Sequence, residues 1–376
     1  MTSISPTAQT LRAAVTAFVH DAGTVATHTD LPVVLRDLAA PGGVAARAVE
    51  ALGSAPLQPT GALRDALDAG QIVATRDVAA SQHALLNGTI LESTKHAVGE
   101  GMNGMLYRYG IAAEPVTDLQ AVLKSHGQGG AIDHFGPQVG RALGLDDLLP
   151  GTTLDAAGAR IEFRPGGGPG HVARDANYLD TALTIRHLAA PGNHLNPLEA
   201  ATAGRIERQL LGSLDYLLAN PDRNPSNLIV DQLLPDASGA VTAIDFGLSG
   251  RGVLGVHGGT TLRPALDSYQ AAAGATHVDL DPEVVSLIRR RLTPARIDAL
   301  HAELVAGPGG RGTLVSSDAF RLGMHERLAQ LLTGRYEFHP YVPGGFAGSV
   351  RTAPVEREAT HGFAAARQAA RDGYGF

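Results

Sequence analysis

Asp222-Arg223-Asn224-Pro225-Ser226-Asn227, followed later in the chain by Asp245-Phe246-Gly247, is the stretch that decides the fold. It places one aspartate five residues before an asparagine and adds a second aspartate further on. Carboxylate and amide oxygens are suitable ligands for Mg²⁺, and a separate carboxylate can orient a hydroxyl group for attack. The pattern predicts Asp222 as a catalytic base and Asn227 and Asp245 as metal ligands.

The residues around this stretch predict how it is held. A helix is expected from Pro197, at the favoured first helical position, until shortly before Pro221, because apolar residues recur between them at helical spacing. The β-prone runs 228–230 and 241–244 enclose a turn-rich segment, 235–239, and predict a hairpin. The hairpin would carry one metal-ligand candidate at each end.

The chemistry explains why these residue types occur together. A phosphoryl group in transit carries negative charge spread over its oxygens, so its transfer depends on positioning and on neutralisation by metal ions. A base, two oxygen ligands and a loop that presents them meet that need. The sequence therefore predicts an ATP-dependent phosphotransferase with ATP and Mg²⁺ as cofactors.

The order of these motifs also resembles a known family. The string from Leu217 to Val230, then Ala243 to Gly247, resembles the phosphatidylinositol 3-/4-kinase-like branch of the protein-kinase-like fold. Bacterial relatives of that branch include serine kinases of toxin–antitoxin systems. The resemblance implies an α+β fold of two lobes, a small β-rich N-lobe and a mainly helical C-lobe, with the nucleotide between them. At the residues before Asp222, this chain differs from eukaryotic-type protein kinases and from aminoglycoside phosphotransferases.

A nucleotide-binding lobe is predicted upstream. Gly99, Gly101 and Gly104 fit a G-x-G-x-x-G loop, in which backbone amides approach the phosphates. Twenty residues after Gly104 the apolar run 121–124 ends in Lys124, where a kinase places its phosphate-binding lysine. Lys95 is the competing candidate for that role.

The lysine of a kinase is held by an acid on the following helix. The segment from Ile132 to Leu145 resembles a bacterial kinase-like pattern with a glutamate about a dozen residues before a final Leu-Gly-Leu. Asp133 occupies that place and is the predicted catalytic partner of Lys124. Because Gly136-Pro137 should interrupt a helix, an alternative interpretation makes Asp133 only an N-cap.

The chain divides into four predicted parts. Strand-like alternation ends near Arg164, and a glycine- and proline-rich stretch follows, which favours a lobe boundary near residue 165. Helices are expected over 281–292, 293–304 and 320–332. The parts are an extra helical N-terminal extension with disordered first residues, 1–84; the N-lobe, 85–165; the C-lobe, 166–339; and a loosely packed tail, 340–376.

Composition excludes several classes of protein. The 376-residue chain has no cysteine, which excludes disulfides and thiol catalysis, and its net charge of −7 opposes a nucleic-acid or anionic-membrane binder. No run of about eighteen apolar residues and no signal-like N-terminus is present, so neither membrane spanning nor general secretion is expected. The fifteen histidines show no metal-binding spacing. Few basic residues follow Asp245, which disfavours a lipid acceptor.

Three functions remain open at this point. The first is a bacterial protein kinase that phosphorylates a Ser/Thr hydroxyl of a protein partner. The second is a phosphotransferase for a metabolite or an antibiotic. The third is a kinase-like fold that transfers another group from ATP or only binds nucleotide. Family analogy favours the protein kinase.

The scarcity of lysine bears on where the protein works. The chain has two lysines, Lys95 and Lys124, among 30 basic residues. Replacement of lysine by arginine would limit ubiquitination of an effector delivered into a host cell by a specialised secretion system. The same bias arises from a GC-rich genome, which leaves a cytoplasmic location as the main expectation.

Overall fold

The computed structural model describes most of the chain between Val78 and Pro340. The described residues are 78–101, 104–113, 119–124, 128–156, 158–164, 179, 183–184, 186–187, 197–223, 227–230, 241–250, 264–266 and 275–340. Residues 1–77, the segment 165–178 after the predicted boundary, the turn 235–239 and nearly all of the tail lie outside them.

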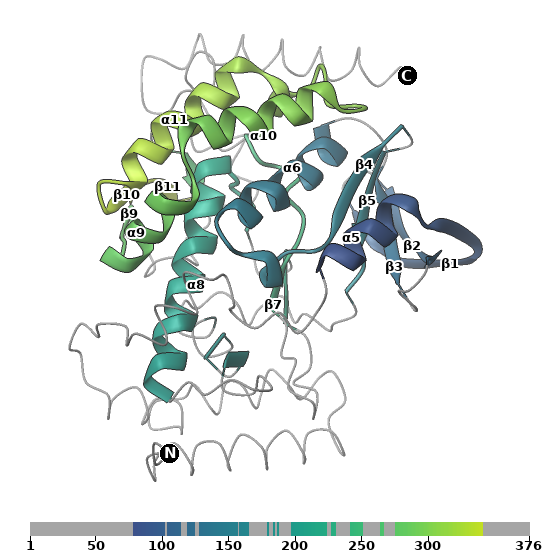
Figure 1. Cartoon of the computed structure of the whole chain (residues 1–376), viewed down its shortest axis with the longest axis horizontal. Coiled ribbons are helices and arrows are strands. Elements are labelled where there is room, and N and C mark those ends of the chain that lie inside the picture. The colour runs from purple at the N-terminus through teal and green to yellow at the C-terminus, as the bar shows by residue number, and fades with distance from the viewer. Residues whose placement is uncertain are drawn as a thin grey trace.

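A five-stranded antiparallel sheet forms one side of the molecule (Figure 1). Its order is β1-β2-β3-β5-β4, with β1 Thr89–Gly101, β2 Gly104–Ala112, β3 Gln120–Lys124, β4 Thr152–Asp155 and β5 Gly158–Glu162. Alternate residues of β2 and β3, including Ile111 and Ala121, are buried against the helix α5, Val78–Asn87. Because α5 packs on this sheet, the predicted boundary at residue 84 falls inside a helix of the N-lobe layer.

The helix α6, Gln128–Ala142, packs on the sheet and also reaches the helices beyond it. Its apolar residues Ile132, Phe135 and Val139 recur at helical spacing and are fully buried. At its end Gly144 adopts a left-handed backbone with φ of 82°, and the Leu145 amide donates to the Gly140 carbonyl, which together cap the helix. The predicted Leu-Gly-Leu is therefore a helix terminus.

The expected interruption of this helix at Gly136-Pro137 is wrong. Pro137 lies inside a continuous α6. A proline there removes the hydrogen bond to the carbonyl four residues earlier, which belongs to Asp133. Burial of the apolar face of α6 in the main core outweighs that loss.

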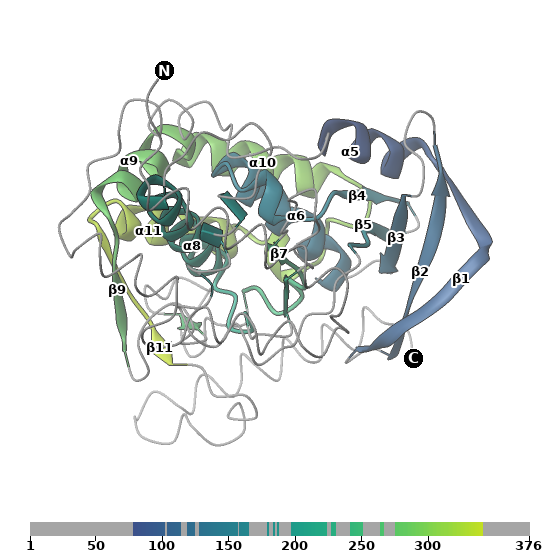
Figure 2. The ribbon, with the colours of Figure 1, turned by 90° about the horizontal axis from the view of Figure 1, so that it is seen from below.

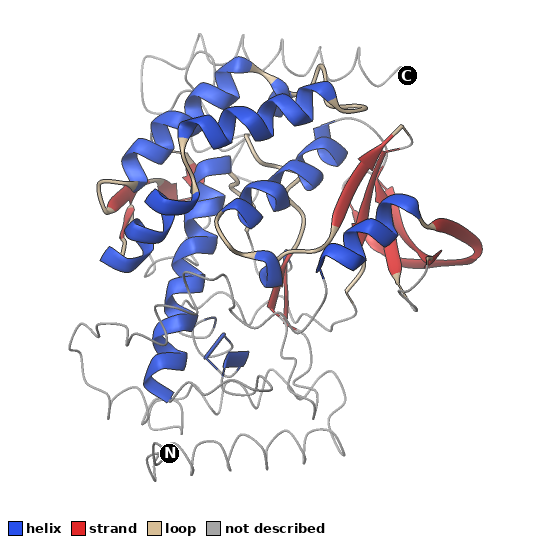
Figure 3. Ribbon diagram, viewed as in Figure 1, coloured by secondary structure: helices blue, strands red, loops and turns tan. Residues whose placement is uncertain are grey.

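The other side of the molecule is mainly helical, as Figure 3 shows. Its helices are α8 Pro197–Leu218, α9 Pro282–Arg291, α10 Pro294–Ala306 and α11 Asp318–Leu331, with 3-10 turns η1 Asp146–Leu148 and η6 Leu314–Ser316. Short strands accompany them: β6 Leu228–Val230, β7 Val241–Ala243, β8 Ala265–Leu266, β9 His277–Asp279, β10 Arg335–Glu337 and β11 His339–Pro340. The expected helices over 281–292, 293–304 and 320–332 are confirmed as α9, α10 and α11. Pro282 and Pro294 begin the first two.

The two sides meet across α6 (Figure 2), which contacts β4 and β5 of the sheet and the helices α8 and α10. Arg164 follows β5 and links the sides, because its Nη1 donates to the Asp147 carbonyl at 3.0 Å and to the Thr242 hydroxyl at 2.9 Å. A β-rich lobe and a helical lobe joined in this way confirm the predicted two-lobed, kinase-like α+β fold class. Among the described residues, no helix is both long and apolar enough to cross a membrane.

Candidate active site

The loop after α8 presents Asp222. Helix α8 ends at Leu218, and Ala219 turns the chain with a positive φ of 48°. The Asn220 side chain donates to Asp215 Oδ1 at 3.0 Å and accepts from the Asp222 amide at 3.3 Å. Asp222 is thereby held, partly buried, just beyond the helix end.

Asn227 is bound to Asp222. Its Nδ2 donates to the Asp222 carbonyl at 2.7 Å and to Asp222 Oδ2 at 3.2 Å. These bonds use the amide nitrogen of Asn227, so its side-chain oxygen is the atom suited to a metal ion. The predicted base and the first predicted metal ligand are therefore in contact.

The hairpin brings Asp245 to the same place. Strands β6 and β7 pair antiparallel with Leu228 opposite Ala243, and the Ile244 amide donates to the Asn227 carbonyl at 3.0 Å. Asp245 is the next residue, with φ of 54° and a side chain that is 46% exposed. Aspartate is among the few residues that adopt this left-handed conformation readily. The partly exposed carboxylate of Asp245 thus lies at the end of the β6–β7 pairing, next to the backbone bond between Ile244 and Asn227.

Lys124 and Asp133 join these residues from the other lobe. Lys124 Nζ lies 2.6 Å from Asp133 Oδ2 and 3.1 Å from Asp245 Oδ1. Asp133 lies inside α6 and is 2% exposed, and its Oδ1 accepts the Phe246 amide at 2.6 Å. The alternative of Asp133 as an N-cap is therefore wrong. Strand β3, helix α6 and the Asp-Phe-Gly segment converge on one ammonium group.

The charges of this cluster set its protonation. Burial alone would lower the pKa of Lys124, but the carboxylates of Asp133 and Asp245 outweigh burial and raise this pKa above its ordinary value. Burial raises the pKa of Asp133, which the ammonium of Lys124 opposes. Both oxygens of Asp133 accept hydrogen bonds, which suits the ionised form. Lys124 is therefore a permanently protonated cation at neutral pH.

The glycine motif lies at the tip of the β1–β2 hairpin. Gly101 pairs with Gly104, and Gly99 pairs with Leu106, so all three predicted glycines flank the turn. The competing Lys95 stays on β1, where its Nζ lies 4.3 Å above the centre of the Tyr107 ring. Of the two lysines, Lys124 is the one that meets the acidic residues of the site.

Two supports of the site were missed from the sequence. The first is a buried pair of Arg223 and Asp215 at the loop that presents Asp222. The signal for it was an aspartate within the otherwise apolar end of α8. The second is Gly136, where a Cβ atom would lie 2.7 Å from two ring atoms of Phe246. Gly136 lets α6 approach the Asp-Phe-Gly segment closely.

We expect Gly136→Ala to weaken both the fold and the site. The added methyl overpacks the contact with Phe246, which should lower the free energy of unfolding by about 1 to 3 kcal/mol and displace the Phe246 amide from Asp133. Thermal melting and nucleotide binding measure the two effects. Gly129→Ala is the matched control, because it lies on the same helix with nothing within 4 Å of the added Cβ. Equal behaviour of the two variants would show that the close approach is unimportant.

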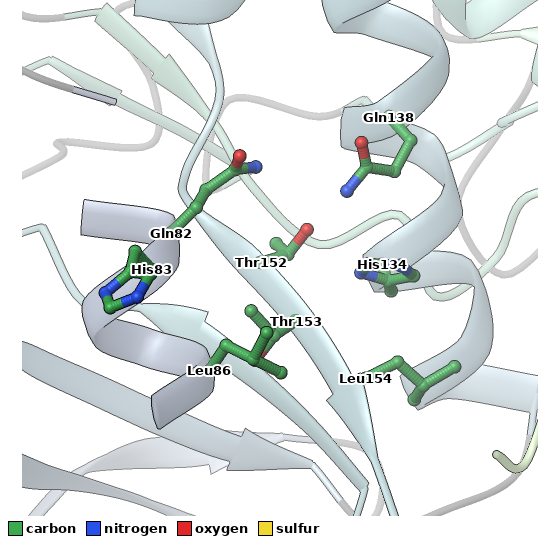
Figure 4. A pocket seen from close by; sticks show the side chains of 8 residues that line it. All are labelled: Gln82, His83, Leu86, His134, Gln138, Thr152, Thr153 and Leu154. Carbon is green, nitrogen blue, oxygen red and sulfur yellow. The ribbon is translucent and has the colours of Figure 1, made fainter. Parts of the chain in front are cut away.

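A pocket of about 400 Å³ lies between α5, α6 and β4, and none of the acids described above lines it (Figure 4). Helix α5, helix α6 and strand β4 line it with Gln82, His83, Leu86, His134, Gln138, Thr152, Thr153 and Leu154. Burial, reinforced by the nearby Arg141, lowers the pKa of His134 to about 4, so this imidazole is neutral at pH 7. The lining residues include no carboxylate to bind a metal or activate a hydroxyl.

Comparisons with known proteins add a distant likeness. No protein-family model matches the chain, and no curated protein matches it. Among solved structures, the chain is similar to the crystal structure of a Helicobacter pylori proinflammatory kinase, CtkA. The two are 12% identical, the match covers 65% of this chain and 92% of that chain, and the TM-score is 0.36. We therefore infer function from the side chains of this chain.

Proposed function

We propose that this chain is an ATP- and Mg²⁺-dependent phosphotransferase that phosphorylates a Ser/Thr hydroxyl of a protein. The observation that carries the proposal is that the five predicted polar residues form two contacting groups at one end of the β6–β7 ladder. Lys124 contacts Asp133 and Asp245, Asn227 contacts Asp222, and the Ile244 amide next to Asp245 bonds the Asn227 carbonyl. A base, two oxygen ligands and a lysine are the parts that phosphoryl transfer needs.

The residues fit a bound magnesium ion. Asp245 offers a carboxylate that is nearly half exposed, and Asn227 offers its side-chain oxygen, because the bonds to Asp222 use its amide nitrogen. Within the described residues no cluster of three or more His, Asp or Glu side chains could hold a metal. A Mg²⁺ ion shared with nucleotide phosphates needs only one or two protein ligands, so this set suffices. When bound, the ion would neutralise charge on the transferred group.

The protein groups then have distinct roles. Asp133 fixes the ammonium of Lys124 where it can bind phosphate oxygens, and the glycines of the β1–β2 turn would let backbone amides approach them. Asp222 would orient the acceptor hydroxyl and take its proton. The Asn227 contact at 3.2 Å keeps the Asp222 carboxylate turned toward the metal ligands.

A protein acceptor follows from the family resemblance of the motifs. The branch that carries an Asp-Arg pair before the metal-binding asparagine includes bacterial kinases with protein substrates. The partner is then a protein with an accessible Ser or Thr. A metabolite acceptor is the alternative result that the assay below distinguishes.

The test is transfer of label from γ-labelled ATP with Mg²⁺, with and without cell extract, beside Lys124→Ala. We expect the wild type to label itself or an extract protein, and the variant to lose most of that activity. ATP consumption without protein labelling would replace the protein acceptor by a small molecule. Lysine-independent labelling would contradict the proposed site.

A further inference from the structure

Arg223 and Asp215 form a buried ion pair directly beneath the catalytic loop. Both side chains are fully buried. Arg223 Nε lies 3.2 Å from Asp215 Oδ2, and Nη2 lies 3.1 Å from Oδ1, which is a two-point contact. Asp215 also accepts from Asn220, so the pair is joined to the loop that presents Asp222.

The remaining nitrogen of Arg223 bonds the residue before β6 and the residue after β7. Nη1 donates to the Asn227 carbonyl at 3.0 Å and also to the Ile244 carbonyl. Asn227 is itself one ligand candidate, and Ile244 directly precedes the other. The guanidinium carbon also lies 4.5 Å from the centre of the Phe246 ring.

From these contacts we infer that Arg223, held by Asp215, is a positioning residue that sets the spacing of the two metal ligands. One nitrogen bonds the backbone of both ligand segments at the point where the β6–β7 ladder ends. Because Asp215 lies on α8, Arg223 anchors the spacing of the two proposed ligands to this helix and not to the loop. The inference rests on the proposed function, since it concerns the ligands of that site.

The chemistry of the two basic residues supports a geometric role. A guanidinium has five donors in one plane, and here they serve a carboxylate and two carbonyls at once. An ammonium is a compact charge that cannot span that set. Stability alone is a poor reason for such a pair, because buried ion pairs can often be replaced by apolar residues without loss.

The experiment compares metal binding with melting. The variants are the apolar pair Asp215→Leu with Arg223→Met, the single Arg223→Lys, and the control Glu207→Gln. Glu207 is a buried acid earlier on α8, 3.0 Å from Arg186, and has no place in the site. Binding of Mn²⁺ with a non-hydrolysable ATP analogue is read from the paramagnetic resonance of the free ion. Melting temperature is measured on the same samples.

We expect both Arg223 variants to bind Mn²⁺ about ten- to a hundredfold more weakly, as for other residues that orient metal ligands. The apolar pair should melt close to the wild type, and Glu207→Gln should change melting and leave Mn²⁺ binding intact. Wild-type Mn²⁺ binding in Arg223→Lys would overturn the inference, whether or not the apolar pair folds. If the wild type itself bound no Mn²⁺ with the analogue, the proposed function would fail and the inference with it. If the wild type binds Mn²⁺ with the analogue, the Mn²⁺ binding of the Arg223 variants tests the inference and leaves the proposed function standing.

Discussion

Asp245→Ala is expected to abolish Mg²⁺-dependent binding of ATP and, with it, phosphoryl transfer. The proposed function assigns this carboxylate as the charged metal ligand, and Asn227, the other proposed ligand, cannot replace a negative charge. Titration with a non-hydrolysable ATP analogue, with and without Mg²⁺, should show that the metal no longer strengthens binding. The loss also frees Lys124 from one of its two carboxylates, at 3.1 Å in the wild type.

Asp245→Asn separates the effect of losing the negative charge from the effect of straining the left-handed backbone. Asparagine tolerates the left-handed conformation of this position, whereas alanine costs about 1 to 2 kcal/mol there. We expect both variants to lose the metal effect. Asp279→Ala removes a carboxylate that is 71% exposed on β9 and serves as the control. Retention of Mg²⁺-dependent binding in Asp245→Asn would assign the metal to other residues.

Asp222→Ala is expected to remove turnover while sparing nucleotide binding. The side chain contacts Asn227, one proposed metal ligand, but the proposed function assigns it to the acceptor hydroxyl. Loss of a general base lowers rates by about 10²- to 10⁴-fold. Mg²⁺-dependent binding of the analogue should stay within a few-fold of the wild type, because Asp245 and Lys124 are unchanged.

The measurement is a single-turnover transfer assay with the acceptor found from labelling. Asp222→Asn keeps a group that can still contact Asn227 but cannot accept a proton, and it should be equally slow. Wild-type turnover in Asp222→Asn would show that this carboxylate is not the base. A joint loss of binding and turnover would move Asp222 into the metal site instead.

Local signals in the sequence predicted the main helices of the helical lobe and the β6–β7 hairpin. Helices α8, α9 and α10 begin at Pro197, Pro282 and Pro294, as the first-turn preference of proline predicts. The hairpin of β6 and β7 followed from two short β-prone runs. Motif spacing predicted that Asp222, Asn227 and Asp245 would lie near one another, because the interval between Asp222 and Asn227 and the hairpin after it are both short. The contact of Lys124 with Asp133 was expected from the family resemblance.

Tertiary packing accounts for what the sequence did not reveal. Pro137 was expected to break a helix, and only the burial of α6 in the core overrides that local preference. Spacing already favoured Lys124 over Lys95, and strand order supplies the physical reason, since β3 lies at the centre of the sheet and β1 at its edge. The contact of Arg223 with Asp215 joins a loop to a helix face, which no periodic pattern encodes.

The short acid at position 133 has a consequence for recognising related chains. Aspartate reaches Lys124 and Phe246 together only because α6 lies close to both, and that closeness requires the bare backbone of Gly136. A glutamate would move the helix outward and leave a gap at Gly136. We therefore expect the two positions to covary, with Asp-x-x-Gly in some relatives and Glu followed by a larger residue in others. An alignment search that demands only glutamate would overlook the first group.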